Sequence, residues 1–344
     1  MKSGICFSVW IILVFGVVPN ALAQTKTFHG SIMGENTSTI EMQLTRNGNA
    51  LSGVYRYDTV GKPLSLKGNI DGAGKFKLEE SDSTVKVTGQ FEGTYKTDQF
   101  SEGGDVLDGN WNAGTGKDPL DFYLVEEIIQ IPKDWSITTK VLSDKKIELS
   151  IAYPQWVGGA ASLQKLNARI AALSNKMAKE YRSFKSSPEQ SGQLGCNYRI
   201  VFANESFISI FQDCDSFMGG AHPNVEHYSY NFDVRSGREI KLSELFSNPQ
   251  SYRSALSNSS AEQIAARLKV EDLSGNGSGN EDYSVPAEQL NEVVAWGMTP
   301  KGLIITYDLP HVIEALARVY LPYEKISKIL KPNGPVSLVK SSTK

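Results

Sequence analysis

The 344-residue chain contains few of the residue types on which enzyme and metal chemistry most often depends. It has three cysteines and four histidines, and no CxxC, HxH, HxxxH or GxSxG pattern occurs in it. Without a CxxC pair or convergent histidines the sequence offers no ligand set for zinc, and without a GxSxG serine it offers no nucleophile of the hydrolase type. We therefore predict no catalytic residues, no metal site and no cofactor.

Long apolar stretches are equally scarce, and the one that exists lies at the N-terminus. Residues 5–18 are mostly apolar, Lys2 precedes them, and the small residues Ala21 and Ala23 frame a cleavage position. This arrangement is typical of a removable export signal over residues 1–23. No later run approaches the roughly 18 apolar residues that a membrane-spanning helix needs. We expect a mature chain without a transmembrane segment, periplasmic or secreted after cleavage near Ala23.

An excess of positive charge is also missing. The net charge is -3, and it becomes -4 when Lys2 is removed with the signal. A nucleic-acid partner would require a basic face for its phosphates, so we exclude one. A small negative charge is compatible with a basic protein partner, which it would attract over a long range.

The mature chain keeps two cysteines, Cys196 and Cys214. Residues 198–202 and 207–211 form two apolar segments around a polar turn at residues 203–206. The midpoint between the cysteines falls in that turn, so the two side chains would face each other across a hairpin. In an oxidising compartment this predicts a structural disulfide, which would contribute about 3 kcal/mol by the chain-entropy estimate.

Composition divides the chain into two domains. Residues 24–127 are rich in Gly, Thr, Ser and Asp, with short alternating segments between turn signals. A glycine flanked two residues away by apolar side chains recurs at Gly53, Gly68, Gly89 and Gly109. This predicts an all-β antiparallel meander or barrel-like domain. We place a linker at residues 128–134, an α+β domain with helices packed on an antiparallel sheet at 135–332, and a flexible tail at 333–344.

The second domain shows clearer periodicity. Apolar residues at three- and four-residue steps predict a long helix over residues 163–184, and alternation predicts strands over 146–153 and 302–307. A second helix should open near Asn248, and a short one should close the domain at residues 322–330. Residues 272–283 partly match a calcium loop, but the final glutamate is replaced by Tyr283, which favours a surface loop.

A glycine turn at residues 219–222 leads into the strand of residues 225–234. Tyr228, Tyr230 and Phe232 share one face of this strand. Two interpretations remain open. In the first, these aromatic side chains, the aromatic row, belong to the core, and the glycines only permit the turn. In the second, the turn with His222 and Pro223 forms the rim of a binding site.

Taken together, these segments resemble the C-terminal domain of the RsiV family. The matching stretches are residues 219–222, 230–233, 236–238, 242–246, 299–307 and 319–326, and residues 147–184 resemble the companion domain that precedes it. The resemblance covers roughly residues 135–332. RsiV is a membrane-anchored anti-sigma factor whose outer portion binds lysozyme, and the same domain pair also occurs on peptidoglycan deacetylases with a separate catalytic domain.

The resemblance implies recognition of a lysozyme-like muramidase or of cell-wall glycan. The family's loop before the last strand is rich in Pro, Tyr and Gly, whereas residues 308–317 keep one proline and no tyrosine. If this loop binds, Pro310, His311 and Glu314 are the expected contacts, and the alternative is an ordinary connection between elements. We expect a non-enzymatic binding protein that inhibits a lysozyme-like hydrolase, as a lysozyme inhibitor or toxin-immunity protein. A peptidoglycan-binding module is the alternative, and an enzyme of another type is the third hypothesis.

Overall fold

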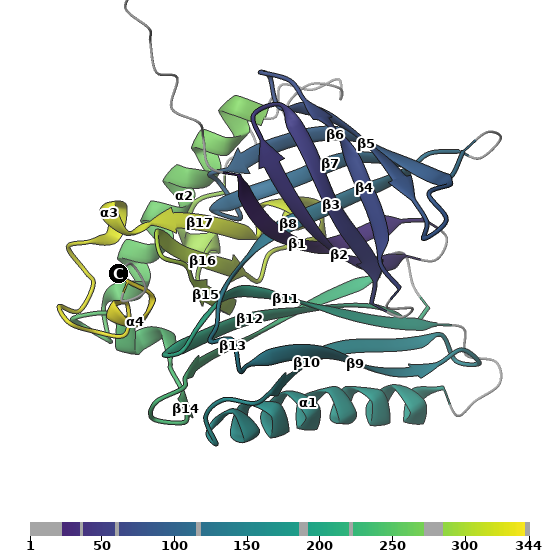
Figure 1. Cartoon of the computed structure of the whole chain (residues 1–344). Helices are drawn as coiled ribbons and strands as arrows, with labels where there is room; N and C mark the ends of the chain where they lie inside the picture. Colours follow the sequence, from purple (N-terminus) through teal and green to yellow (C-terminus); the bar gives the residue numbers. More distant parts are fainter. Residues whose placement is uncertain are drawn as a thin grey trace, which may run out of the picture.

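The computed structural model describes residues 23–34, 37–58, 62–114, 118–185, 192–219, 223–271 and 285–340. The predicted signal up to residue 22, His222 and the calcium-like loop lie outside these residues. Figure 1 shows three parts: a barrel, a long sheet with one helix beneath it, and a smaller C-terminal sheet with its own helices. Within the described part of the chain, no helix is both long enough and apolar enough to cross a membrane.

The N-terminal part is an antiparallel up-and-down barrel. Its strands are β1 (Gln24–Met33), β2 (Ser38–Asn47), β3 (Ala50–Tyr57), β4 (Leu64–Ile70), β5 (Lys75–Ser81), β6 (Val87–Asp98), β7 (Gly104–Asn112) and β8 (Leu120–Gln130). Each strand pairs with the next, and β1 also pairs with β8, which closes the barrel. The predicted all-β antiparallel domain is therefore present.

The recurring glycines have a steric explanation. A Cβ at Gly53 would lie 2.0 Å from the carbonyl oxygen of Gln43, and one at Gly109 would lie 2.1 Å from that of Glu92. The strands approach too closely there for any larger residue. Apolar side chains at alternate positions fill the interior, among them Phe28 and Phe91, as is usual for a small barrel.

The second part is a long sheet that continues from the barrel. Its strands are β9 (Ser136–Asp144), β10 (Leu149–Val157), β11 (Gln193–Asn204), β12 (Phe207–Phe217), β13 (Asn224–Asp233) and β14 (Arg238–Glu239). The last residues of β8 pair in parallel with residues 202–204 of β11. The predicted linker at 128–134 therefore differs from the structure, because its first three residues belong to a strand shared by the barrel and the sheet.

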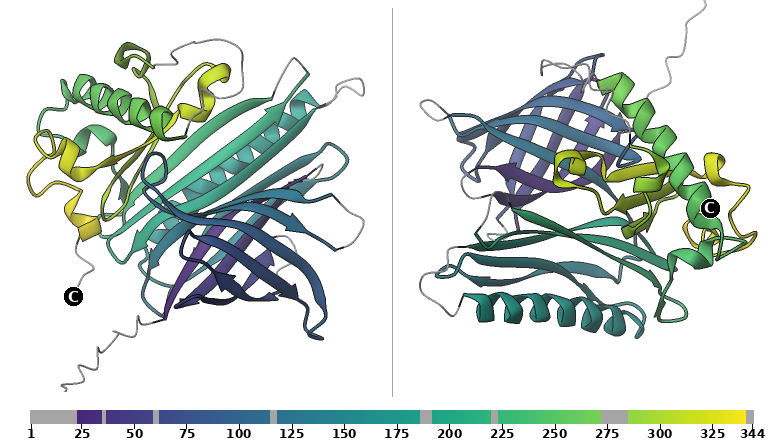
Figure 2. Two further views of the ribbon diagram at one scale, coloured as in Figure 1. Left: turned by 90° about the horizontal axis from the view of Figure 1, so that it is seen from above. Right: turned by 180° about the vertical axis from the view of Figure 1, so that it is seen from behind.

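Helix α1 (Leu163–Phe184) covers one face of this sheet and has the predicted bounds. Its apolar side packs on β10 to β13. Cys196 and Cys214 are directly opposite partners in the β11–β12 hairpin and form a disulfide, which confirms the prediction. The barrel and the C-terminal part lie side by side on the other face of the sheet (Figure 2).

The C-terminal part is a small antiparallel sheet between two layers. Its strands are β15 (Val293–Met298), β16 (Gly302–Tyr307) and β17 (Arg318–Pro322), and its helices are α2 (Tyr252–Glu271), α3 (Tyr323–Ile326), α4 (Ser337–Lys340) and the 3-10 helices η1 (Leu242–Leu245), η2 (Ala287–Gln289) and η3 (His311–Leu316). One face of the sheet packs on β11 and β12. The other face packs on α2.

Two predictions about the C-terminal residues need correction. The closing helix is shorter than expected, since α3 ends at Ile326. Residues 333–340 are part of the fold rather than a flexible tail, because Val336 and Val339 are buried in the same core as α2. Burial of these two side chains holds α4 against the core. Residues 341–344 lie outside the described part.

The aromatic strand resolves as core. Tyr230, Phe232 and Val234 are buried between β13 and α1. The opposite face of β13 is covered too, since Asn231 donates a hydrogen bond of 2.7 Å to the carbonyl of Trp296 in β15. Of the two interpretations of this segment, the first therefore holds for the aromatic row. Pro223, the first described residue after the turn, is not part of this core and is exposed.

Candidate functional site

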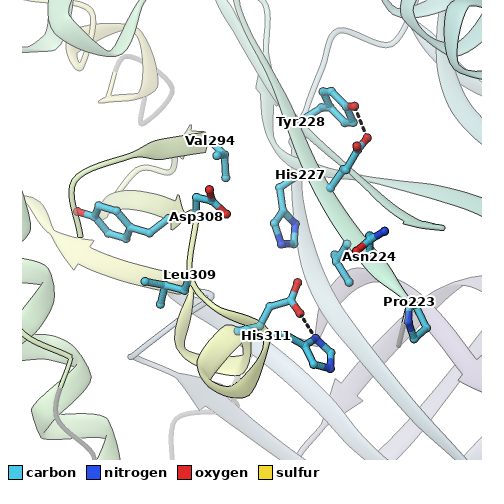
Figure 3. A pocket seen from close by; sticks show the side chains of 12 residues that line it. Pro223, Asn224, His227, Tyr228, Val294, Asp308, Leu309 and His311 are labelled. Atoms are coloured by element: carbon cyan, nitrogen blue, oxygen red, sulfur yellow. Dashed lines mark hydrogen bonds and ion pairs between the residues drawn. The ribbon is translucent and has the colours of Figure 1, made fainter. Parts of the chain in front are cut away.

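An open groove of about 440 Å³ lies between the start of β13 and the segment after β16. Pro223, Asn224 and His227 line it from the β13 side (Figure 3). Asp308, His311 and Glu314 line it from the other side. The groove thus joins two segments that are far apart in the sequence.

Local structure holds the second wall in place. Strand β16 ends at Tyr307, and Pro310 precedes the 3-10 helix η3 with an extended backbone. The N–H of Ile313 donates to the carbonyl of Pro310 at 2.9 Å, which closes the first turn. A helix this short depends on such local bonds and on what its side chains pack against. The polar side chains of η3 are therefore carried by a turn whose backbone is held by hydrogen bonds.

His311 and Glu314 form a pair on this turn. The Nδ1 atom of His311 lies 2.9 Å from Oε2 of Glu314, and the histidine side chain is 50% exposed. Three of the five residues predicted for partner binding, Pro223, His311 and Glu314, line the same groove. Pro310 lies beside it at the start of η3, and His222 falls outside the described residues.

The groove is acidic. Glu226, Asp308 and Glu314 are carboxylates among its lining residues, and neither Lys nor Arg contributes to the described lining. Burial and the neighbouring charge of Asp213 raise the pKa of Asp215, and Glu314 adds to this effect. With no lysine or arginine among the described lining residues, the three carboxylates make the groove negative.

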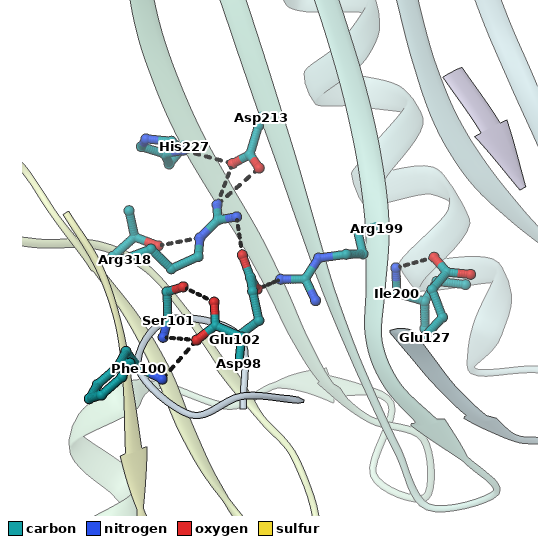
Figure 4. Close-up of polar contacts among 11 residues, drawn as sticks. Asp98, Phe100, Ser101, Glu102, Glu127, Arg199, Ile200, Asp213, His227 and Arg318 are labelled. Atoms are coloured by element: carbon teal, nitrogen blue, oxygen red, sulfur yellow. Dashed lines mark hydrogen bonds and ion pairs between the residues drawn. The ribbon is translucent and has the colours of Figure 1, made fainter. Parts of the chain in front are cut away.

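Behind the groove, His227 enters a network of charges that the sequence did not reveal (Figure 4). Its Nδ1 atom lies 2.7 Å from Oδ1 of Asp213 in β12. Arg318 of β17 contacts both oxygens of Asp213 at 2.9 Å. Glu102, from the β6–β7 loop of the barrel, contacts Arg318 at 3.6 Å and Arg199 at 2.5 Å. The network therefore connects all three parts of the chain.

The alternation of β13 could have located His227. Tyr228 and Tyr230 belong to the core face, so His227 must belong to the face with Ser229 and Asn231, toward β15 and the groove. Its carboxylate and arginine partners come from other strands and leave no local pattern. Pairing at this range is visible only in the tertiary structure.

A second charged cluster lies where the barrel meets the long sheet. His29 of β1 is 4% exposed, and its Nε2 atom lies 2.9 Å from Oδ2 of Asp58. Its Nδ1 atom lies 3.7 Å from Oε1 of Glu127, which accepts a hydrogen bond from the N–H of Ile200. Burial alone would lower the pKa of His29, but the bond to Asp58 and the charge of Glu127 outweigh it and raise the pKa to about 9.

Within the described residues, no group of three or more His, Cys, Asp or Glu side chains could hold a metal ion. The groove offers carboxylates, an exposed imidazole and a proline edge on a rigid base. This arrangement can hold a basic side chain or segment of a partner.

Comparison with known proteins gives distant similarities. The family model described as "Deacetylase PdaC" matches residues 141–225, from β9 to the start of β13. No curated protein matches the chain. A solved structure of a DUF3298 family member from Bacteroides fragilis is similar at 16% identity and a TM-score of 0.40, covering 60% of this chain and 98% of that chain. A DUF3298 family protein from Pseudomonas aeruginosa is similar at 15% identity and a TM-score of 0.41, covering 59% and 96%.

Proposed function

We propose that this chain is an exported, non-enzymatic binding protein that binds and inhibits a lysozyme-like peptidoglycan hydrolase. The observation that carries the proposal is the acidic groove. Pro223, His311 and Glu314, chosen from the sequence as contacts, lie together around it. Such a protein would serve as a lysozyme inhibitor or as an immunity protein against a hydrolase toxin.

The charge of the groove supports a basic partner. Glu226, Asp308 and Glu314 form a negative patch that would attract a basic enzyme and accept its Arg or Lys side chains. Complementary charge mainly raises the association rate and fixes the orientation of docking. The exposed turn of η3 provides the part that would enter the partner's glycan cleft.

The rigidity of the base also favours binding. The strands next to the groove are tied together by the Cys196–Cys214 disulfide between β11 and β12 and by the Arg318–Asp213 pair between β17 and β12. A loop held by a stiff scaffold loses little conformational freedom on binding. The disulfide further supports location in the periplasm or outside the cell, where thiols are oxidised.

Binding of peptidoglycan itself is the second candidate. Exposed aromatic side chains would be its usual signature, and among the described residues Tyr123 alone belongs to the exposed class, at 36%. That residue lies on β8 of the barrel and is not among the residues that line the groove. The acidic groove therefore favours the protein partner.

One experiment separates the two candidates. The mature chain is mixed with lysozymes of several structural types, and muramidase activity is followed by clearing of a cell-wall suspension, with complex formation followed by size-exclusion chromatography. We expect a stoichiometric complex and loss of activity with at least one type. Sedimentation with bare peptidoglycan without any inhibition would contradict the proposal and support the second candidate.

A further inference from the structure

A second cavity, of about 740 Å³, lies on the other side of the Val294 bulge from the acidic groove. Its described lining residues come from β13, η1, the first turns of α2, the segment before β15, and β15 and β16. Figure 1 shows where α2, β15 and β16 lie in the fold. Its volume is in the range of pockets that hold small organic ligands. Val294 and Tyr307 line both hollows, so the two sites share a wall.

Two buried aromatic residues in this cavity have polar atoms without a protein partner. Trp296 is 8% exposed and Tyr252 is 7% exposed. Neither the indole Nε1–H of Trp296 nor the hydroxyl of Tyr252 makes a hydrogen bond within the described part of the chain, and neither atom is sealed from solvent. Buried polar groups normally have partners, so these two donors point to a ligand or ordered water in the cavity.

The other buried polar side chains among the described lining residues, Ser257 and Tyr307, already have protein partners. Ser257 donates to the carbonyl of Leu290 at 2.5 Å, and the hydroxyl of Tyr307 shares a hydrogen bond of 2.8 Å with Ser260. The N–H of Trp296 donates to Ser229 at 3.1 Å. The contrast leaves the Trp296 indole and the Tyr252 hydroxyl as the buried side-chain donors of the described lining without a protein partner.

The rim of the cavity carries positive charge. Lys241 and Arg253 line it and are exposed, and Arg253 makes no ion pair within the described residues. Glu292 is the one carboxylate among the described lining residues. Side-chain donors and cations thus outnumber acidic groups, which is the opposite of the groove next to it.

We propose that this cavity binds an acidic saccharide, a sugar ring that carries a carboxylate. The sugar's hydroxyl and amide oxygens would accept hydrogen bonds from Trp296 and Tyr252, and the faces of these aromatic rings suit the C–H face of a sugar. The carboxylate would pair with Arg253, whose guanidinium matches its geometry, and with Lys241. This site does not depend on the inhibitory function proposed for the groove.

The test compares N-acetylmuramic acid with its neutral methyl ester, by calorimetric titration of the mature chain at low salt. The ester removes the negative charge of the lactyl carboxylate and adds one methyl group. We expect saturable binding of the acid and at least tenfold weaker binding of the ester. Equal affinity for both probes, or no binding of the acid at millimolar concentration, would overturn the proposal.

Variants locate the binding. Arg253→Gln should weaken binding of the acid about tenfold, since it removes one charge-assisted pair. Tyr252→Phe removes only the hydroxyl and keeps the ring that stacks on Phe246 at 4.4 Å, and it should weaken the acid and the ester alike. Lys269→Gln, on the same helix but outside the cavity, is the matched control and should bind as the unchanged chain does.

Thermal melting shows whether each variant remains folded before titration. Binding of the acid by Arg253→Gln with unchanged affinity would place the sugar elsewhere and reject this cavity. The groove variant Glu314→Gln should leave the sugar titration unchanged. Failure of saccharide binding and failure of hydrolase binding are therefore separate results.

Discussion

The guanidinium of Arg318 in β17 contacts both carboxylate oxygens of Asp213 in β12 at 2.9 Å. Burial would raise the pKa of Asp213, but the charge of Arg318 and the bond to His227 outweigh it and hold that pKa well below its usual range. Arg318 also stacks over the ring of Phe211 at 4.8 Å. One side chain thus fastens the small sheet to the long sheet beneath the groove.

Replacing Arg318 by methionine should destabilise the fold by about 2–4 kcal/mol, because it leaves Asp213 and Glu102 without their shared cation. Urea unfolding followed by circular dichroism measures the loss. Arg235→Met is the control, since Arg235 and Glu205 form an exposed pair at 3.7 Å, and an exposed pair contributes at most about 1 kcal/mol. Equal effects of the two substitutions would show that the buried network does not stabilise the fold.

The His29 cluster should make stability depend on pH. The pKa of His29 is raised to about 9 in the folded chain, against about 6.5 when unfolded. The stabilisation from the protonated imidazole is therefore fully present below about pH 6.5 and is lost as pH rises through about 9, a decline of about 3–4 kcal/mol. Urea titrations at several pH values measure this slope. His29→Gln should flatten it, and an unchanged slope in that variant would refute the assignment.

Reduction of the disulfide should lower stability by about 3 kcal/mol, since the bond restricts the unfolded chain. The bond lies in the hairpin core, with Cys196 and Cys214 both buried. Thermal unfolding with and without a reductant measures the change, and a Cys196→Ala, Cys214→Ala double variant provides the control. The double variant should melt near the reduced chain and show no response to the reductant.

Glu314→Gln should weaken the complex with a sensitive hydrolase, because it removes one groove carboxylate and the partner of His311. The loss should be about tenfold at low salt and smaller at high salt, chiefly through slower association. Surface plasmon resonance at two salt concentrations measures it. Glu79→Gln, an exposed carboxylate of the barrel strand β5, is the matched control. An equal loss in both variants would indicate net charge rather than the groove.

Gly103 should tolerate no side chain. It has a φ of +63°, and an added Cβ would lie 2.2 Å from the ring of Tyr320. Gly48 has a φ of +60° but open space around it, so Gly48→Ala gives the backbone cost alone, about 1–2 kcal/mol. Gly103→Ala should cost about 1–3 kcal/mol more through overpacking. Equal unfolding free energies would mean that the barrel loop is free to move away from β17.

Local signals predicted much of the fold. The period of apolar residues gave helix α1 its bounds, and the turn between two apolar segments gave the disulfide its partners. The recurring glycines indicated a curved β domain because strand contact alone excludes a Cβ. The chain end was misjudged, since nothing in its sequence shows that Val336 and Val339 have a core to enter.

The candidate site also has features that the sequence indicated and features that only the tertiary structure shows. Pro223 could be chosen from the sequence because the glycine turn is a local feature, and His311 and Glu314 because the resemblance to the RsiV family points to the loop of residues 308–317. Their meeting in one groove could not, and neither could the pairing of Arg318 with Asp213 or the placement of Trp296 in the second cavity.

The sequence by itself led us to expect an export signal. It also determined the division into two regions of different composition, the disulfide, and the helices and strands whose apolar residues recur with a clear period. Only the tertiary structure decided that β1 pairs with β8, that the barrel loop bearing Glu102 reaches Arg318, and that an acidic groove adjoins a cationic cavity. The physical reason is range. Periodicity and turn chemistry act within a few residues, whereas burial and charge pairing depend on surfaces that meet only after the chain has folded.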